Sequence, residues 1–257
     1  MSETTFGEIA LNLIKWMNSL SKNVRKINFK EIIEKIYNYV ETVDSFSEKL
    51  QLLLIQMGWP PLNDVYLKDM IKYVTKFIEQ DLDIERVRGE FTEYLLHFYN
   101  ETLLNNMLNQ WKNNPCLVKR MPIIDMSMEA HFQGKYYLSI PALLAQIEGI
   151  IASGFNHEGY MGERTLKNYI EQLSRSNNEI IGEIFKSFYL NYILAGFAHG
   201  SEANSSLSRH AILHGGDISY GTKENSLKTI ILLDYLQDAL KQIKDQKNVH
   251  PLTVSLH

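Results

Sequence analysis

The chain has 257 residues, with 26 basic and 30 acidic side chains, a formal net charge of −4 and a pI near 6.1. Its 14 glycines and 6 prolines are too few for a sheet-rich chain with many turns or for proline-rich disorder, and a hydrophobic content of 45% suffices for a core of normal size. The mild acidity argues against a protein that coats long nucleic acids, but it leaves room for one small basic site that cuts RNA.

Cysteine content and apolar patterning indicate the compartment. A single cysteine, Cys116, excludes an intrachain disulfide and a cysteine-built zinc site, and it favours a reducing environment. The first residues lack the basic and apolar regions of a secretory signal, and no apolar run approaches the roughly 18 residues of a membrane span. We therefore expect a cytoplasmic protein with no membrane association.

Apolar residues recur at helical spacing from the start of the chain. The N-terminal part is predicted to form helices over residues 9–20, 32–54, 67–78 and 87–111. Trp59-Pro60-Pro61 ends the second helix and Asn113-Asn114-Pro115 ends the fourth, because proline does not fit a helix interior. We place a domain boundary there, between an N-terminal helical region of unassigned role (1–115) and a C-terminal helical domain (116–257).

The C-terminal part continues the helical pattern. It predicts helices over residues 123–131, 140–151, 166–173, 180–197 and 222–243. A glycine-containing loop spans 153–164 and a polar connection spans 200–206. Thr222 is expected to cap the last helix, with Asn225 three residues on. No segment alternates with period two, so the predicted fold is an all-α helical bundle.

Candidate chemistry gathers between Ser208 and Gly216. Arg209 presents a planar, permanently charged fork that suits phosphate oxygens, and His210 and His214 are side chains able to exchange protons near neutral pH. RNA cleavage by its own 2′-hydroxyl needs such groups: a base, an acid and a cation beside the phosphorane. That route requires no metal ion.

The spacing of these residues restricts how they meet. Arg209 and His214 are five positions apart, about 140° around an ideal helix, whereas His210 and His214 share a face. Arg209 and His214 therefore converge only if the helix ends or distorts near Gly215, or if a second protomer supplies part of the site. The second option predicts a dimer with two such stretches facing across a two-fold axis.

Two other interpretations of this stretch stay open. Arg209 and His214 are also what a basic helix C-terminus contains, where cations bind the last carbonyls. His210 and His214 match the i, i+4 histidine pair of zinc helices, although the glutamate that follows the first histidine in such enzymes is absent. We expect no metal site.

The Arg-x4-His spacing of Arg209 and His214 resembles the Arg-x(4–6)-His signature of the HEPN superfamily of helical RNases. Residues 136–150 and 220–228 are similar to the corresponding segments of bacterial HEPN-like proteins, many of them linked to phage defence or toxin–antitoxin functions. The resemblance covers roughly residues 120–240, and no motif covers the N-terminal part.

The resemblance implies a metal-independent, cofactor-free endoribonuclease whose site forms between two protomers. Arg209 would bind the scissile phosphate, and His214 would be the general base or acid. His210 takes a position that the family often gives to Asn, Asp or His, and it would orient RNA or share proton transfer. The implied partners are RNA, a second copy of the chain, and an antitoxin or defence-system protein. The alternative is a non-catalytic HEPN-like module that binds RNA or a nucleotide.

Several polar residues around this stretch are supporting candidates. Glu148, on the apolar side of its helix, either forms an ion pair that holds Arg209 or reaches solvent or caps another helix. Tyr220 and Asn225 flank the start of the last helix, where they contact RNA or serve in capping and packing. His131, His157 and His199 are expected to be ordinary surface or loop residues.

Overall fold

The computed structural model describes residues 54–62, 84–175, 179–201 and 203–249. Packing divides the chain into two units, residues 1–49 and 50–257, and every described residue belongs to the second. The described residues contain helices and no strand, so the predicted all-α fold is confirmed for them. The predicted helices over 9–20 and 67–78, and nearly all of the one over 32–54, lie outside the described residues.

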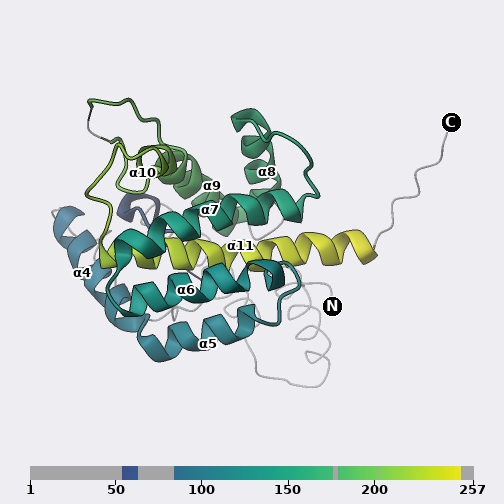
Figure 1. The fold of residues 1–257 in the computed structure, drawn as a ribbon, viewed down its shortest axis with the longest axis horizontal. Helices are drawn as coiled ribbons and strands as arrows, with labels where there is room; N and C mark the ends of the chain where they lie inside the picture. Colours follow the sequence, from purple (N-terminus) through teal and green to yellow (C-terminus); the bar gives the residue numbers. More distant parts are fainter. Residues whose placement is uncertain (1–53, 63–83, 176–178, 202, 250–257) are drawn as a thin grey trace, which may run out of the picture. The chain divides into compact units, whose positions relative to one another are not determined.

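The order of the elements is simple. They are α4 (Ile84–Phe98), α5 (Glu101–Trp111), the 3-10 helix η1 (Val118–Arg120), α6 (Met121–Phe132), α7 (Tyr136–Gly154), α8 (Glu163–Arg175), α9 (Glu179–Phe188), the π-helix η2 (Tyr189–Ile193), α10 (Arg209–Leu213) and α11 (Lys223–Val249). Figure 1 shows this arrangement, with α6 and α7 running along α11.

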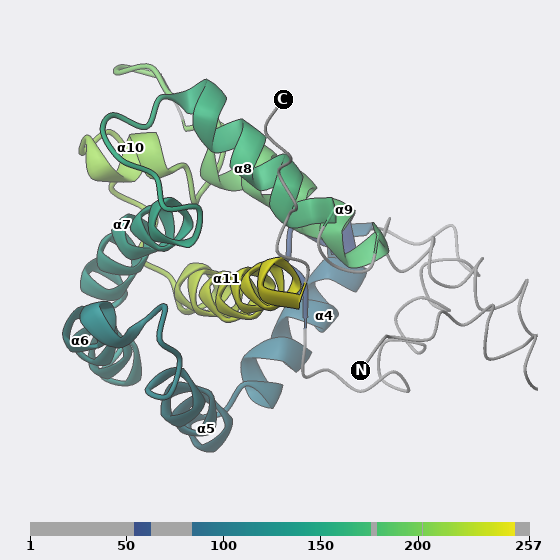
Figure 2. The same cartoon turned by 90° about the vertical axis from the view of Figure 1, so that its right-hand side faces the viewer.

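Helix α11 forms the centre of the packing. Figure 2 looks nearly along this helix and shows α4 to α9 surrounding it. Residues 225–237 are all buried, whichever way their side chains point. A helix that is apolar around most of its circumference has to be covered on every side, and the neighbouring helices supply that cover. The Thr222 hydroxyl accepts a hydrogen bond from the Asn225 amide (3.1 Å), which confirms the predicted cap.

Polar side chains on α11 bind its neighbours one by one. Asp234 accepts a hydrogen bond of 2.7 Å from the Trp111 indole at the end of α5. Ser226 contacts both α6 and α7, through His131 and Ser139, at 2.7 Å each. Because a buried polar group without a partner costs more than a hydrogen bond returns, these pairs fix which helix faces which part of α11.

Contacts cross the predicted domain boundary at residue 115. The Asn114 amide donates to the Gln237 side chain (2.6 Å), just beyond Trp111 and Asp234 along the same two segments. The division at 115 therefore runs through hydrogen-bonded contacts, while the division by packing falls after residue 49.

Two predicted helices differ from the structure. The pattern over 87–111 is broken into α4 and α5, because the Asn100 side chain accepts a hydrogen bond from the Leu103 amide (3.0 Å) and caps a new helix. The helix predicted over 180–197 ends at Ile193 after a π-helical turn. Beyond that turn the Ala195 carbonyl accepts a hydrogen bond from the Ser208 hydroxyl (2.8 Å), so the chain leaves the helix to meet the start of α10.

Helix α7 corrects one expectation about apolar length. Among the described residues it is the one helix that is long and apolar enough, by those criteria alone, to cross a membrane. A core helix passes the same test, and α7 buries Ile140, Leu143, Ile147 and Ile150 against the bundle. Packing explains the buried face of this helix, and the cytoplasmic location stays a prediction.

Candidate functional site

Helix α10 has only five residues and begins at Arg209. The buried Ser208 side chain caps it by accepting a hydrogen bond from the Ala211 amide (3.2 Å), while its hydroxyl donates to the Ala195 carbonyl (2.8 Å). Ser208 thus joins the first turn of α10 to the segment that follows the π-helix. This double contact determines where the Arg209 backbone lies.

Arg209 forms an ion pair with Glu148 of α7. Their side chains are 21% and 28% exposed, and burial lowers the pKa of the Arg209 guanidinium, although an arginine keeps its charge. The structure supports the first of the two interpretations of Glu148, the ion pair with Arg209. The interpretation of Arg209 as a helix C-terminal cation is wrong, because Arg209 is the first residue of α10, where the helix dipole disfavours positive charge.

The other end of α10 is shaped by Gly215. His214 is the C-cap, and Gly215 follows with a φ of +71°, a left-handed conformation that glycine adopts without strain. The Gly216 amide donates to the Ala211 carbonyl (2.7 Å) and the Gly215 amide to the Ile212 carbonyl (3.2 Å), the hydrogen bonds of a Schellman motif. The helix therefore ends just before Gly215, which is one of the two conditions that the sequence set for Arg209 and His214 to converge.

The two histidines lie side by side on the surface. Their ring centroids are 4.7 Å apart with an angle of 36° between the planes, which confirms the predicted shared face. Both side chains are exposed. A pair of exposed imidazoles beside a half-buried guanidinium is suited to proton exchange with a ligand that the cation binds.

A pocket of about 190 Å³ brings Arg209, His210 and Glu148 together. Its other lining residues come from the loop before α8, from α8 and from the end of η2: Tyr160, Met161, Glu163, Leu166, Ile193 and Leu194. His214 does not line this pocket; its ring lies beside that of His210, which does. The pocket is thus a site of mixed charge with one guanidinium and one imidazole.

Of the six lining residues that were not sequence candidates, two have polar side chains, Tyr160 and Glu163. Glu163 pairs with Lys167 (2.6 Å), and this hydrogen bond, more than the nearby His210, lowers the pKa of the Glu163 carboxyl. Tyr160 lies in the loop between α7 and α8, inside the predicted loop over 153–164. Two features of the sequence could have identified them. Tyr160 is an aromatic residue between Gly159 and Gly162, and Glu163 is an acidic residue at the start of the next helix.

Tyr220 and Asn225 serve the fold in this structure. Pro141 lies within α7 and has no amide hydrogen for the Tyr137 carbonyl four residues earlier, and the Tyr220 hydroxyl donates to that carbonyl instead (3.2 Å). Asn225 is buried, and its amide donates to the carbonyls of Ser206 (3.1 Å) and Tyr220 (2.9 Å). Both residues bind the segment before α11 to the bundle, which is the capping and packing role considered for them.

The expectation for His131 is wrong. His131 is buried on the stripe of α6 that also holds Ile124 and Met128, and one ring nitrogen lies 2.7 Å from the Ser226 hydroxyl. Burial, together with the Lys223 charge, lowers its pKa to about 4. Its spacing of seven and three residues from those two core positions was the signal for burial. His199 is exposed, as expected, and His157 is half-buried with its ring 3.0 Å from the Tyr169 hydroxyl.

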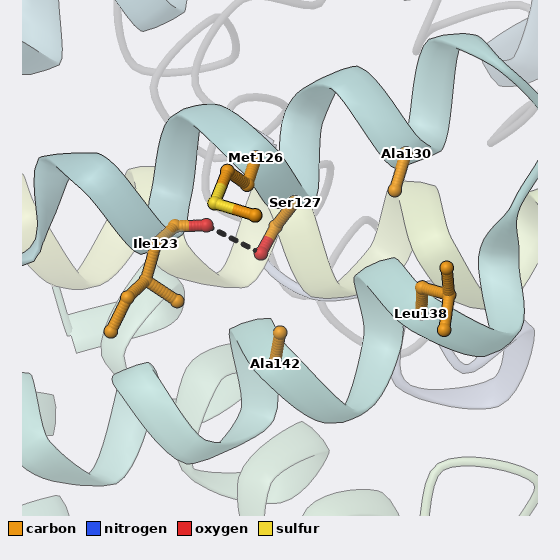
Figure 3. A pocket seen from close by; sticks show the side chains of 6 residues that line it. All are labelled: Ile123, Met126, Ser127, Ala130, Leu138 and Ala142. Carbon is orange, nitrogen blue, oxygen red and sulfur yellow. Dashed lines mark hydrogen bonds between the residues drawn. The ribbon is translucent and has the colours of Figure 1, made fainter.

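A second pocket, between α6 and α7, has a different character. Figure 3 shows its six lining residues, of which one carries a polar side-chain atom: the Ser127 hydroxyl, which donates to the Ile123 carbonyl (2.7 Å). The side chains that line this pocket therefore include no acid or base. Within the described ranges, no three His, Cys, Asp or Glu side chains gather as a metal site would require.

The ion pair of Arg209 and Glu148, the pair of His210 and His214, and the pocket around them form the candidate site. Models of protein families, curated proteins and solved structures give no match to this chain. The resemblance to HEPN proteins stays a prediction, and the assignment of function depends on the geometry of α7, α10 and the loop before α8.

Proposed function

We propose that this chain is a metal-independent endoribonuclease of HEPN type, acting at the pocket between α7 and α10. The observation that carries the proposal is the grouping of a half-buried Arg209, held by Glu148, with the exposed histidine pair His210 and His214. A guanidinium fixed at one end and directed into a pocket is a phosphate receptor, and adjacent imidazoles supply proton transfer.

The proposed reaction uses the RNA's own 2′-hydroxyl as nucleophile. A base removes the hydroxyl proton, the 2′-oxygen attacks phosphorus, and the bond from phosphorus to the 5′-oxygen breaks as an acid protonates that oxygen. The products are a 2′,3′-cyclic phosphate and a 5′-hydroxyl. Arg209 stabilises the charge that accumulates on the phosphorane, His214 is the base or the acid, and His210 orients RNA or shares the proton transfer.

A second protomer completes the site in this proposal. His214 contacts His210 but lies outside the lining of the pocket that contains Arg209. The missing second proton-transfer group would then come from the partner's copy of the same stretch across a two-fold axis. The biological setting that fits such an enzyme is phage defence or a toxin system, with an antitoxin or defence-system protein as its partner.

The test is an RNA cleavage assay with the full chain in excess EDTA. Wild type is expected to produce fragments with 2′,3′-cyclic phosphate ends, and both Arg209→Ala and His214→Ala are expected to reduce the rate by a factor of about 100 or more. Arg164→Ala and His199→Ala serve as matched controls, because these exposed residues of the same types do not line the pocket. Equal cleavage rates for wild type and the Arg209→Ala, His214→Ala double variant would contradict the proposed endoribonuclease activity.

One observation favours a second candidate, a module that binds RNA or a nucleotide without cutting it. Glu148 already neutralises Arg209, and the described pocket contains one of the two histidines. Binding of RNA with 2′-O-methyl groups, which cannot be cleaved, measures recognition alone. Binding that Arg209→Ala weakens, together with uncut natural RNA under every condition, would support this module over the enzyme.

A further inference from the structure

Tyr160 occupies an unusual position for an aromatic side chain. It is 93% exposed, so its ring gains almost nothing from folding, yet it lines the pocket that contains Arg209 and His210. A residue that both lines a pocket and is open to solvent stands at the mouth of that pocket. An exposed ring beside a cation is a surface available for stacking.

The loop that carries Tyr160 is anchored at its root. The Phe155 ring stacks on the Tyr169 ring of α8 with centroids 4.2 Å apart and 7° between the planes, and the His157 ring lies 3.0 Å from the Tyr169 hydroxyl. Gly159, with a φ of +83°, makes the turn directly before Tyr160. The loop is thus bound to α8 on one side and reaches, on the other, the pocket that Tyr160 and Arg209 both line.

We propose that Tyr160 is a stacking platform for an unpaired RNA base next to the phosphate that Arg209 binds. The inference rests on the proposed function and specifies its substrate class as single-stranded RNA. Every base has an aromatic face, so a tyrosine at the mouth of the pocket binds it without regard to sequence. In a duplex each base already stacks on its neighbours and does not reach the ring.

The experiment measures binding and cleavage separately. Binding uses a 12-nucleotide RNA with 2′-O-methyl groups, single-stranded or annealed to its complement, and cleavage uses the same sequence with natural riboses. Tyr160→Ala is expected to weaken single-strand binding about 5- to 100-fold and to raise KM similarly, with kcat changed less than about threefold. Tyr160→Phe keeps wild-type binding because the ring does the stacking. Duplex binding is expected to be weak in wild type and unchanged by Tyr160→Ala.

Two controls separate a role in binding from a structural one. Ile218→Ala removes another exposed apolar side chain that does not line the pocket, and it is expected to leave binding and KM unchanged. The thermal unfolding temperature of Tyr160→Ala is expected to equal that of wild type, because the ring is exposed. In Tyr160→Trp, stacking of a base is expected to quench the new indole emission when the single strand is added.

The outcomes distinguish this inference from the proposed function. If Arg209→Ala weakens RNA binding but Tyr160→Ala binds like wild type, stacking by Tyr160 is overturned and the function stands. If Arg209→Ala binds like wild type, the proposed phosphate site fails. Wild-type chain that neither binds nor cuts single-stranded RNA overturns both, and equal affinity for duplex and single strand overturns the substrate class.

Discussion

At the scale of single residues, Arg209 is the unusual feature of the described structure. A cation at the start of a helix faces the positive end of the helix dipole, and burial adds the cost of removing water from the guanidinium. Glu148 compensates both effects from the neighbouring helix α7. The Ser208 cap places the Arg209 backbone, and the electrostatic pair with Glu148 holds its side chain.

Glu148→Gln tests that pair. The change leaves Arg209 half-buried without its counter-charge, so we expect the free energy of unfolding to fall by about 1–2 kcal/mol, measured by urea denaturation. Glu163→Gln is the matched control: this carboxylate lines the same pocket but is exposed, and its partner Lys167 is free to remain in water. Equal stability of both variants would show that the ion pair does not hold Arg209.

At the scale of elements, a row of three buried, hydrogen-bonded side chains joins three helices. Ser226 of α11 lies between His131 of α6 and Ser139 of α7, with contacts of 2.7 Å on both sides. The three side chains are buried, and hydrogen bonds in such surroundings are strong because no water competes. These hydrogen bonds hold α6 and α7 in register on α11, and α7 also contains Glu148 of the candidate site.

The pKa of His131 predicts how stability depends on pH. Its folded pKa of about 4 lies below the ordinary value of 6.5, so between these pH values the unfolded chain binds a proton that the folded chain does not. The contribution of neutral His131 to the free energy of unfolding is fully present above pH 6.5. It is lost progressively as the pH falls to 4, and the loss reaches up to about 3 kcal/mol. Urea denaturation at pH 7, 5.5 and 4.5 measures it.

The matched variant is His131→Gln, which keeps a polar side chain and removes the titration. Other groups titrate in the same range, so the informative quantity is the difference between wild type and variant. That difference is expected to change by up to about 3 kcal/mol over the range. Parallel pH profiles would contradict a neutral buried imidazole.

At the scale of the whole molecule, the candidate site is assembled from segments that are far apart in the sequence. Glu148 comes from α7, Tyr160 from the following loop, Glu163 from α8, and Arg209 with His210 from α10. Packing of α7 on α11, and of α10 on α7, brings these segments together (Figure 1). His214 is outside the pocket, which leaves the completion of the site to a second protomer in our proposal.

Mixing two inactive variants tests the shared site. Arg209→Ala and His214→Ala protomers, unfolded together and refolded, form mixed dimers in which one of the two sites retains both groups if each site draws on both chains. We expect such mixtures to regain about a quarter of wild-type cleavage. Mixtures as inactive as either variant alone would place Arg209 and His214 of one site on the same chain, and sedimentation velocity verifies that dimers are present.

Several features could be predicted because they depend on neighbours in the sequence. Helical periodicity predicted the all-α fold, the proline pair predicted the chain's exit from the helix before residue 59, and Thr222 predicted the start of α11. The shared face of His210 and His214 followed from their spacing. The same kind of reasoning failed at Asn100, where a single cap divides one apolar stripe into two helices.

The amino-acid order by itself determined where most of the described helices form and that His210 and His214 lie on one face, because helix geometry is local. Only the tertiary structure decided that Glu148 meets Arg209, that Tyr220 and Asn225 support the fold, that His131 is buried, and that Tyr160 stands at the pocket. Those outcomes depend on which helix faces are covered by partners distant in the chain. A side chain's exposure and charge environment are properties of that packing, and spacing along one helix does not contain them.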